Sequence, residues 1–114
     1  MSFPHRGEIY WVHLDPTIGS EIAKTRPALV ISNDIGNQFS ERVIVAPISS
    51  SGTARVYPFE VLLEPADSGL PRPSKVLLDQ IRTVDKQRLG NRSGIVSDAH
   101  MQDVDAAIRL SLAV

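Results

Sequence analysis

The sequence predicts a small, strongly curved β-barrel of mainly antiparallel strands with one C-terminal helix. Two observations support this prediction. Stretches of turn-forming residues interrupt the chain at short intervals, and the short segments between them are rich in β-branched and aromatic residues, which is typical of a compact antiparallel β-domain. A helical repeat of apolar residues is found chiefly at the end of the chain. The length of 114 residues is sufficient for a single domain, expected over residues 1–114.

Six short segments are predicted as strands from their composition. They are Glu8–Leu14, Ala28–Ser32, Val43–Ile48, Phe59–Leu63, Lys75–Leu78 and Gln80–Val84. The second and third contain the continuous apolar runs Ala28–Ile31 and Val43–Ala46, so we expect these runs to be buried on both faces of the sheet. The first strand places apolar side chains on both of its faces, so both of its faces need cover.

One helix is predicted from about Asp98 to Leu110, after Ser97 as its N-cap. Its apolar residues recur at three- and four-residue spacing, which forms a stripe suited to packing on the sheet. They are Met101, Val104, Ile108 and Leu112. A shorter helix is expected at Asp85–Arg88, ending at Gly90, and a single turn at Asp34–Phe39.

The composition excludes several classes of function. The absence of cysteine excludes a disulfide scaffold, thiolate catalysis and cysteine-ligated metals. The three histidines do not pair at metal-ligand spacing, so no metal site is expected. The sequence contains no P-loop, GxSxG or GxGxxG motif, which argues against a nucleotide-dependent enzyme and a triad hydrolase.

Hydropathy and charge indicate where the protein acts and what it binds. No apolar run approaches the roughly 18 residues of a membrane helix, and the N-terminus does not resemble a secretory signal, so we expect a cytoplasmic protein without a membrane partner. The net charge of −1 does not suit binding of nucleic acid by bulk charge. However, 9 of the 12 basic residues are arginine, whose planar guanidinium suits phosphate and base edges.

Three segments carry most of the functional information. Arg26 precedes Pro27 at the entry to a buried strand, where it is held on a rigid support and either faces a groove or pairs with Glu21. A second core strand ends in Ser49 and Ser50, whose hydroxyls suit either a phosphate or an ordinary polar turn.

The third segment is polar where its neighbours are apolar. Asp79 and Gln80 interrupt an otherwise apolar stretch. Their side chains suit recognition of nucleobase edges, and the alternative is a β-bulge with satisfied side chains.

Together these segments resemble the MazF/PemK (Kid) toxins of type II toxin–antitoxin systems. The resemblance covers nearly the whole chain, and its motifs occur in the family's order. They are Arg6-Gly7-Glu8-Ile9-Tyr10-Trp11, Asp15-Pro16, Gly19-Ser20-Glu21, Arg26-Pro27, Ser32-Asn33-Asp34, Gln80-Ile81-Arg82-Thr83 and the final helix.

The resemblance implies a fold, an activity and partners. The fold is an SH3-like barrel with an added sheet and a C-terminal helix, assembled as a homodimer. The activity is sequence-specific, metal- and cofactor-independent cleavage of single-stranded RNA, chiefly mRNA, leaving 2′,3′-cyclic phosphate and 5′-hydroxyl ends. The partner is a cognate MazE-like antitoxin, whose C-terminal tail lies over the RNA groove.

The resemblance also implies roles for individual residues. Arg26 falls on the family's catalytic arginine, and Ser49 stands where the family commonly has a catalytic threonine, with Ser50 as its substitute. Glu21 is a candidate general base or a partner that orients Arg26. Asp79 matches the aspartate of another catalytic set in the family. Because that set's arginine and histidine positions hold Leu77 and Ser20 here, Asp79 is expected to contact a base.

A further group of residues is expected to contact RNA. The group comprises Gly19, Ser20, Lys24, Thr25, Asn33, Ser50, Arg55, Asp79, Gln80 and Arg82. Two other functions stay open at this point. One is a gyrase-inhibiting, CcdB-like toxin of the same fold, which is not an enzyme, and the other is a non-catalytic RNA-binding barrel.

Overall fold

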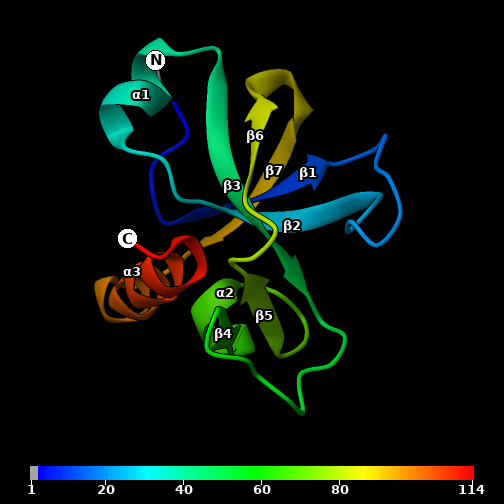
Figure 1. Ribbon diagram of the computed structural model, residues 1–114. Helices are drawn as coiled ribbons and strands as arrows, with labels where there is room; N and C mark the ends of the chain where they lie inside the picture. The colour runs from blue at the N-terminus through cyan, green and yellow to red at the C-terminus, as the bar shows by residue number, and fades with distance from the viewer. Residues whose placement is uncertain (1–2) are drawn as a thin grey trace.

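The computed structural model describes residues 3–114 (Figure 1). Within this range the strands are β1 (Glu8–His13), β2 (Thr25–Val30), β3 (Arg42–Ser49), β4 (Glu60–Leu63), β5 (Ser74–Leu77), β6 (Arg82–Asp85) and β7 (Leu89–Ile95). The helices are α1 (Asp34–Phe39), α2 (Pro65–Ser68) and α3 (Asp98–Leu112), with a 3₁₀ turn, η1, at Lys86–Arg88.

The strands form one antiparallel, strongly curved sheet in the order β4-β5-β3-β2-β1-β7, with β6 also paired to β3. β3 is shared by several partners along its length. Arg42–Val45 pair with β6, Val45–Pro47 pair with β2, and the last two residues pair with β5. The prediction of a mainly β, small barrel of antiparallel strands with a C-terminal helix is confirmed.

The core is divided between the two faces of the curved sheet, because side chains alternate along each strand. Ile9, Leu29 and Ile48 belong to a cluster that also includes residues of α3. Val12 and Ala28 belong to a second cluster on the other face. β1 therefore contributes to the core from both of its faces, at Ile9 and at Val12, whereas Trp11 and His13 are exposed.

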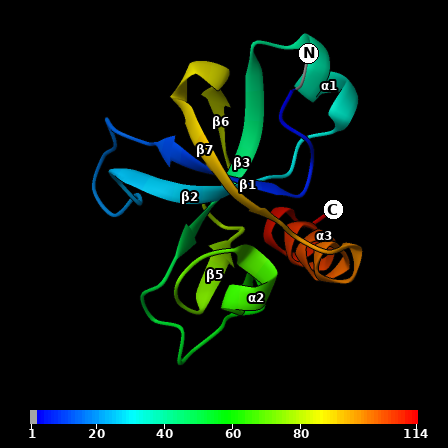
Figure 2. The same cartoon turned by 180° about the vertical axis from the view of Figure 1, so that it is seen from behind.

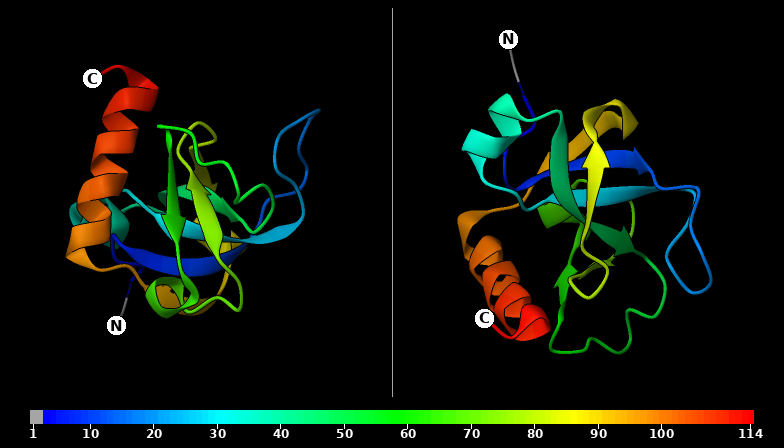
Figure 3. Two further views of the ribbon diagram at one scale, coloured as in Figure 1. Left: turned by 90° about the horizontal axis from the view of Figure 1, so that it is seen from below. Right: turned by 45° about the horizontal axis from the view of Figure 1, so that its top comes forward.

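The C-terminal helix closes one side of the sheet, away from the β1–β2 loop (Figures 1 and 3). The Ser97 hydroxyl accepts the His100 N–H, which confirms the predicted N-cap. Arg6 anchors the helix, since its guanidinium binds the Asp105 carboxylate and donates to the Ile31 carbonyl at 2.9 Å. Near the other end, the Ser111 hydroxyl donates to the Leu78 carbonyl at 2.8 Å.

Some sequence predictions are wrong. Leu89–Ile95 forms β7, although Gly90–Gly94 reads as a turn-rich stretch. The short helix is a 3₁₀ turn that starts at Lys86, and Gly90 does not cap it but lies within β7. The side chain of Ile44 is 40% exposed, so the third strand is not buried on both faces. The missed strand has a physical cause, because long-range pairing with β1 overrides local composition.

Two backbones pass unusually close together where α2 meets β7 (Figure 2). Gly69 caps α2 with φ +74°, and a Cβ built there would lie 2.2 Å from the Ser93 carbonyl oxygen. In β7, a Cβ on Gly94 would lie 2.5 Å from the carbonyl oxygen of Ser68 in α2. Glycine is therefore required at both positions, and the contact fixes how α2 sits on the edge of the sheet.

A buried carboxylate ties the N-terminal segment to the sheet. Glu8 accepts hydrogen bonds from the His5 N–H at 2.6 Å, from Arg92 at 2.6 Å and from the Tyr10 hydroxyl at 3.1 Å. Burial acts to raise the pKa of Glu8, but these hydrogen bonds outweigh it and the pKa is lowered from the ordinary 4.5. The pKa of Asp34 is also lowered, chiefly by a hydrogen bond from the Arg6 N–H.

Stability should therefore fall in acid. A carboxylate whose pKa is lower in the folded chain than in the unfolded chain stabilises the fold fully at any pH above its unfolded pKa. This contribution is lost as the pH falls through the folded pKa. We expect the free energy of unfolding, measured with urea, to decline below about pH 4.5. Glu8→Gln should lower it by about 2 kcal/mol at pH 7 and flatten the decline. An unchanged acid profile in Glu8→Gln would contradict this account.

Candidate functional site

Arg26 is the second residue of β2, and its side chain is half-buried. Its Nε donates to the Ala23 carbonyl oxygen at 3.1 Å. The terminal guanidinium nitrogens form no hydrogen bond with any group in residues 3–114. The guanidinium is thus fixed at one nitrogen and has its other donors available, as electrostatic stabilisation of a reacting anion requires.

The register of β2 and β3 brings Arg26 and Ser49 to the same end of the sheet. Their ladder runs to the pair Ala28 and Pro47. Arg26 lies two residues before Ala28, and Ser49 lies two residues after Pro47. Arg26 and Ser49 therefore lie at the same end of neighbouring strands, where each strand meets a loop. Beyond the ladder, Ser49 pairs with Lys75 of β5.

Two clefts open beside this end of the sheet. The arginine cleft has a volume of about 330 Å³ and includes Trp11, Thr25, Arg26, Ser50, Arg72 and Ser74 in its lining. The glutamine cleft has a volume of about 210 Å³ and is lined by Glu21, Ile22, Asp79, Gln80, Ile81 and Arg82. The candidate residues that line a cleft are thus divided between two clefts rather than gathered in one.

One segment of the β1–β2 loop links the two clefts. The Ile22 N–H donates to the Gln80 side-chain oxygen at 2.8 Å in the glutamine cleft. One residue later, the Ala23 carbonyl holds Arg26 in the arginine cleft. Gln80 thus serves as an anchor for the loop as well as a lining residue, and its amide NH₂ forms no hydrogen bond with a group in residues 3–114.

The two candidate hydroxyls are placed differently. Ser49 is half-buried, and its Oγ accepts the Ser51 N–H at 3.1 Å. Ser50 is exposed and lines the arginine cleft, whereas Ser49 is not among the residues that line it. The Ser49 hydroxyl retains its own proton for donation, so both hydroxyls are chemically able to bind a phosphate oxygen.

Glu21 does not contact Arg26. It is exposed, and its Oε1 accepts the Ile18 N–H at 2.6 Å. Within residues 3–114 no ion pair joins Glu21 to Arg26, so the structural bridge considered from the sequence does not form. The Ala23 carbonyl, rather than a carboxylate, orients the guanidinium.

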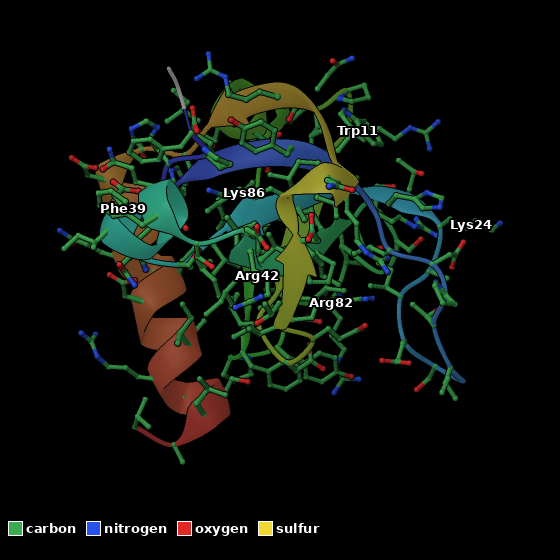
Figure 4. All side chains as sticks on the ribbon, turned by 90° about the horizontal axis from the view of Figure 1, so that it is seen from above. Trp11, Lys24, Phe39, Arg42, Arg82 and Lys86 are labelled. Carbon is green, nitrogen blue, oxygen red and sulfur yellow. The ribbon has the colours of Figure 1, made fainter. Side chains whose placement is uncertain are left out.

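The other candidate residues lie in or beside the β1–β2 loop, and Figure 4 labels two of them, Lys24 and Arg82. Gly19 and Ser20 are exposed in a turn, and Lys24 is exposed with φ +68°. Thr25 lines the arginine cleft, and its hydroxyl contacts the His13 Nδ1 at 2.9 Å. Arg82 donates from Nη1 to the Leu14 carbonyl at 3.0 Å, which braces the base of the β1–β2 loop.

Asn33 and Arg55, two further predicted contacts, lie at the N-cap of α1 and in the β3–β4 loop. Asn33 caps α1, and its side-chain oxygen accepts the Gly36 N–H at 2.7 Å. Arg55 is exposed in the β3–β4 loop, where its guanidinium lies 5.1 Å from the centre of the Tyr57 ring. Both have structural contacts of their own, and neither lines the arginine cleft or the glutamine cleft.

Among the members of the arginine cleft that sequence reasoning missed, Trp11 and Arg72 have the side chains best suited to RNA. Trp11 lines this cleft and is 38% exposed (Figure 4). In the sequence, Trp11 alternates with Ile9, which predicts an ordinary core position. Arg72 lies between two prolines in a stretch that reads as a turn. Only the folded arrangement brings Arg72 to the cleft that Arg26 lines, so no local signal could have identified it.

Two negative findings concern the described part of the chain. Residues 3–114 hold no group of three or more His, Cys, Asp or Glu side chains placed to bind a metal ion. Among these residues there is also no helix with the length and apolar character needed to cross a bilayer.

Comparison with known proteins identifies the family. A profile described as "PemK-like, MazF-like toxin of type II toxin-antitoxin system" matches residues 5–112. The chain belongs to the PemK/MazF toxin family. It is 44% identical to Endoribonuclease EndoA of Bacillus subtilis (strain 168) over 109 residues, which cover 96% of this chain and 94% of that protein.

Solved structures of PemK/MazF toxins share its fold. MazF from Deinococcus radiodurans superposes with a TM-score of 0.84 and is 28% identical, with all of both chains covered. A mycobacterial endoribonuclease, solved in complex with its cognate antitoxin, gives a TM-score of 0.81 at 27% identity over 97% of this chain and 96% of that one. These matches confirm the fold predicted from the motifs.

Proposed function

We propose that this PemK/MazF toxin is a sequence-specific endoribonuclease that cleaves single-stranded messenger RNA through the RNA's own 2′-hydroxyl, without a metal ion. The endoribonuclease activity is supported by the family and by the 44% identity to EndoA. The observation that carries the chemistry is the arrangement at the end of β2 and β3, where Arg26 and Ser50 line one cleft and Ser49 directly precedes Ser50. This placement suits a guanidinium and an alcohol meeting at one phosphodiester.

The reaction is an internal transesterification of the RNA, in which only protons are exchanged with the enzyme or the solvent. The 2′-oxygen attacks the adjacent phosphorus as its proton passes to a general base. The phosphorus–O5′ bond then breaks, and the departing oxygen takes up a proton. The products are a 2′,3′-cyclic phosphate and a 5′-hydroxyl. Because the nucleophile belongs to the substrate, the enzyme has to align it, move protons and stabilise the crowded phosphorane.

Each candidate residue has a role in this scheme. The Arg26 guanidinium stabilises the charge that develops on the non-bridging oxygens, since its terminal donors are available. Ser49, or Ser50 in the arginine cleft, donates to a phosphate oxygen. Glu21 is the candidate general base, because its exposed carboxylate lies in the β1–β2 loop, which also holds Arg26 through the Ala23 carbonyl.

The glutamine cleft is the proposed site of base recognition. Asp79 and Gln80 line it, and both side chains can recognise base edges by hydrogen bonding. Gln80 keeps its NH₂ group for a base while its oxygen holds Ile22. The β1–β2 loop and the start of β2 would flank the RNA, through Gly19, Ser20, Lys24 and Thr25.

Two protein partners are part of the proposal. One is a second copy of the chain, for which the exposed apolar groove of about 460 Å³ between the sheet and α3 offers a surface. Its apolar lining consists of Ile31, Ile44, Ile81, Ile108 and Leu112. The other is a MazE-like antitoxin with an acidic C-terminal tail that occupies the RNA groove. The cytoplasm is the proposed site of action, since messenger RNA is found there.

The decisive experiment maps RNA ends. We expect the purified protein to cleave a long single-stranded RNA in EDTA at a restricted set of sequences, leaving cyclic phosphate and 5′-hydroxyl ends. Substituting 2′-deoxyribose on the 5′ side of the cut should abolish cleavage there, because the nucleophile is removed. Uncleaved RNA with a folded protein would reject the proposal, and inhibition of gyrase by that protein would favour the CcdB-like alternative. Continued cutting at the deoxy position would refute attack by the 2′-hydroxyl.

A further inference from the structure

A buried ion pair lies beside the candidate site. The Lys75 Nζ contacts the Glu60 Oε1 at 3.0 Å, and the two side chains are only 10% and 7% exposed. Burying two charges is costly, and a buried pair often stabilises a fold no more than apolar side chains of the same size would. The role of this pair is therefore better inferred from the other groups that Lys75 and Glu60 bind than from the attraction between their charges.

Both members of the pair hold the backbone of one loop, the β3–β4 loop of residues 50–59. The Lys75 Nζ also donates to the Arg55 carbonyl oxygen at 3.2 Å. The Glu60 Oε1 accepts the Tyr57 N–H at 3.0 Å. In addition, a Cβ on Gly52 would lie 3.4 Å from the Lys75 Nζ, so the loop folds closely over the ammonium group.

The stem of this loop contains the candidate hydroxyls. The loop leaves β3 after Ser49, runs below β5 in Figure 1 and rejoins the sheet at Glu60. β5 lies between the two stems, and Lys75 is paired directly with Ser49 on one side. Directly opposed residues in an antiparallel ladder have neighbouring side chains on the same face. Lys75 therefore stands next to Ser49 and one residue from the start of the loop at Ser50.

We propose that Lys75, together with Glu60, is a positioning residue that fixes the β3–β4 loop for sequence-selective RNA cleavage. This inference rests on the proposed function. The ammonium group acts on the substrate through the loop, by holding Ser49 and Ser50 at the scissile phosphate and Arg55 beside the RNA strand. The loop follows the last residues of β3, so its position sets which nucleotides fit next to the cleaved bond.

The test uses the double variant Lys75→Met/Glu60→Gln, because Lys75→Met alone leaves an unpaired buried carboxylate. The amide oxygen of the introduced glutamine can still accept the Tyr57 N–H, so the change removes the charges and the tether to Arg55. Trypsin provides a readout without RNA, since it cuts after Arg55 only when that segment opens. We expect cleavage after Arg55 to accelerate about tenfold, while cleavage after Lys24, in the β1–β2 loop, stays unchanged as an internal reference.

The second readout is RNA cleavage at several sites in one transcript. We expect kcat/KM at the preferred site to fall about tenfold, as a small misplacement of reacting groups produces, and the relative rates at the other sites to change. Lys86→Met removes one lysine from the η1 turn and should leave both readouts unchanged. Thermal midpoints verify that every variant is folded.

The outcomes separate the inference from the proposed function. Unchanged cutting after Arg55, or faster cutting with unaltered relative rates at all RNA sites, overturns the positioning role. A change in thermal stability with neither readout altered indicates a structural role alone and also overturns it. A parent protein that does not cut RNA overturns the proposed function and this inference together, while the trypsin measurement still decides whether the pair tethers the loop.

Discussion

Arg26→Ala should yield a folded protein whose kcat for RNA cleavage is lower by about 10³-fold, the effect of removing a preorganised donor from a developing oxyanion. The fold should persist, because the only hydrogen bond of this side chain within residues 3–114 is the one to the Ala23 carbonyl. Arg26→Lys should recover little of the activity, since a lysine lacks the planar pair of donors. Single-turnover cleavage of a labelled RNA measures the effect, and circular dichroism monitors the fold.

The matched controls are the two serines. If Ser49 carries the phosphate contact, Ser49→Ala should lower kcat about tenfold to a hundredfold while Ser50→Ala changes it little. The reverse order would assign the contact to Ser50 in the arginine cleft. An Arg26→Ala protein that cleaves RNA as fast as the parent would contradict the role given to the guanidinium.

Gly69→Ala should destabilise the protein by about 3 kcal/mol, the largest effect on stability that we expect from a single methyl group. Two costs add at this position. The backbone has φ +74°, which strains an L-residue, and the new Cβ would lie 2.2 Å from the Ser93 carbonyl oxygen. That oxygen belongs to the backbone of β7, so it cannot move aside as a flexible side chain would. Urea unfolding measures the loss of stability.

Gly19→Ala separates the two costs. Gly19 has a similar positive φ of +60°, but within residues 3–114 no heavy atom beyond its two chain neighbours lies within 4 Å of the position where its Cβ would be. This variant should therefore lose only about 1 kcal/mol, the cost of the backbone conformation. Equal losses at the two positions would show that the contact between α2 and β7 does not limit the fold.

Local patterns predicted the elements that carry strong periodicity. The spacing of Met101, Val104 and Ile108 located α3, and the apolar runs located β2 and β3 to within three residues at each end. β7 was missed, because Leu89–Ile95 contains two glycines and no apolar alternation. Its strand conformation comes from pairing with β1, with register shifts along the ladder. Pairing of this kind depends on residues about 80 positions away along the chain.

In the candidate site, too, some residues could be predicted from local sequence and others could not. Arg26, Ser49 and Gln80 stand in short motifs at strand ends, so the sequence alone could propose them. Trp11 and Arg72 meet at the arginine cleft only in the folded chain, where β1 and the segment between α2 and β5 both line it. The Lys75–Glu60 pair was also invisible, because a lysine in a predicted strand reads as exposed, whereas the fold buries it under the β3–β4 loop.

The short segment between Glu21 and Arg26 has a consequence for how such an enzyme discriminates. Its Ile22 N–H is bound by the Gln80 side chain, and the carbonyl of the next residue binds the Arg26 guanidinium. A nucleotide that disturbs the first attachment would also shift the second. Unfavoured RNA sequences should therefore bind almost as well as favoured ones but react slowly, so that fidelity is expressed in turnover rather than in affinity.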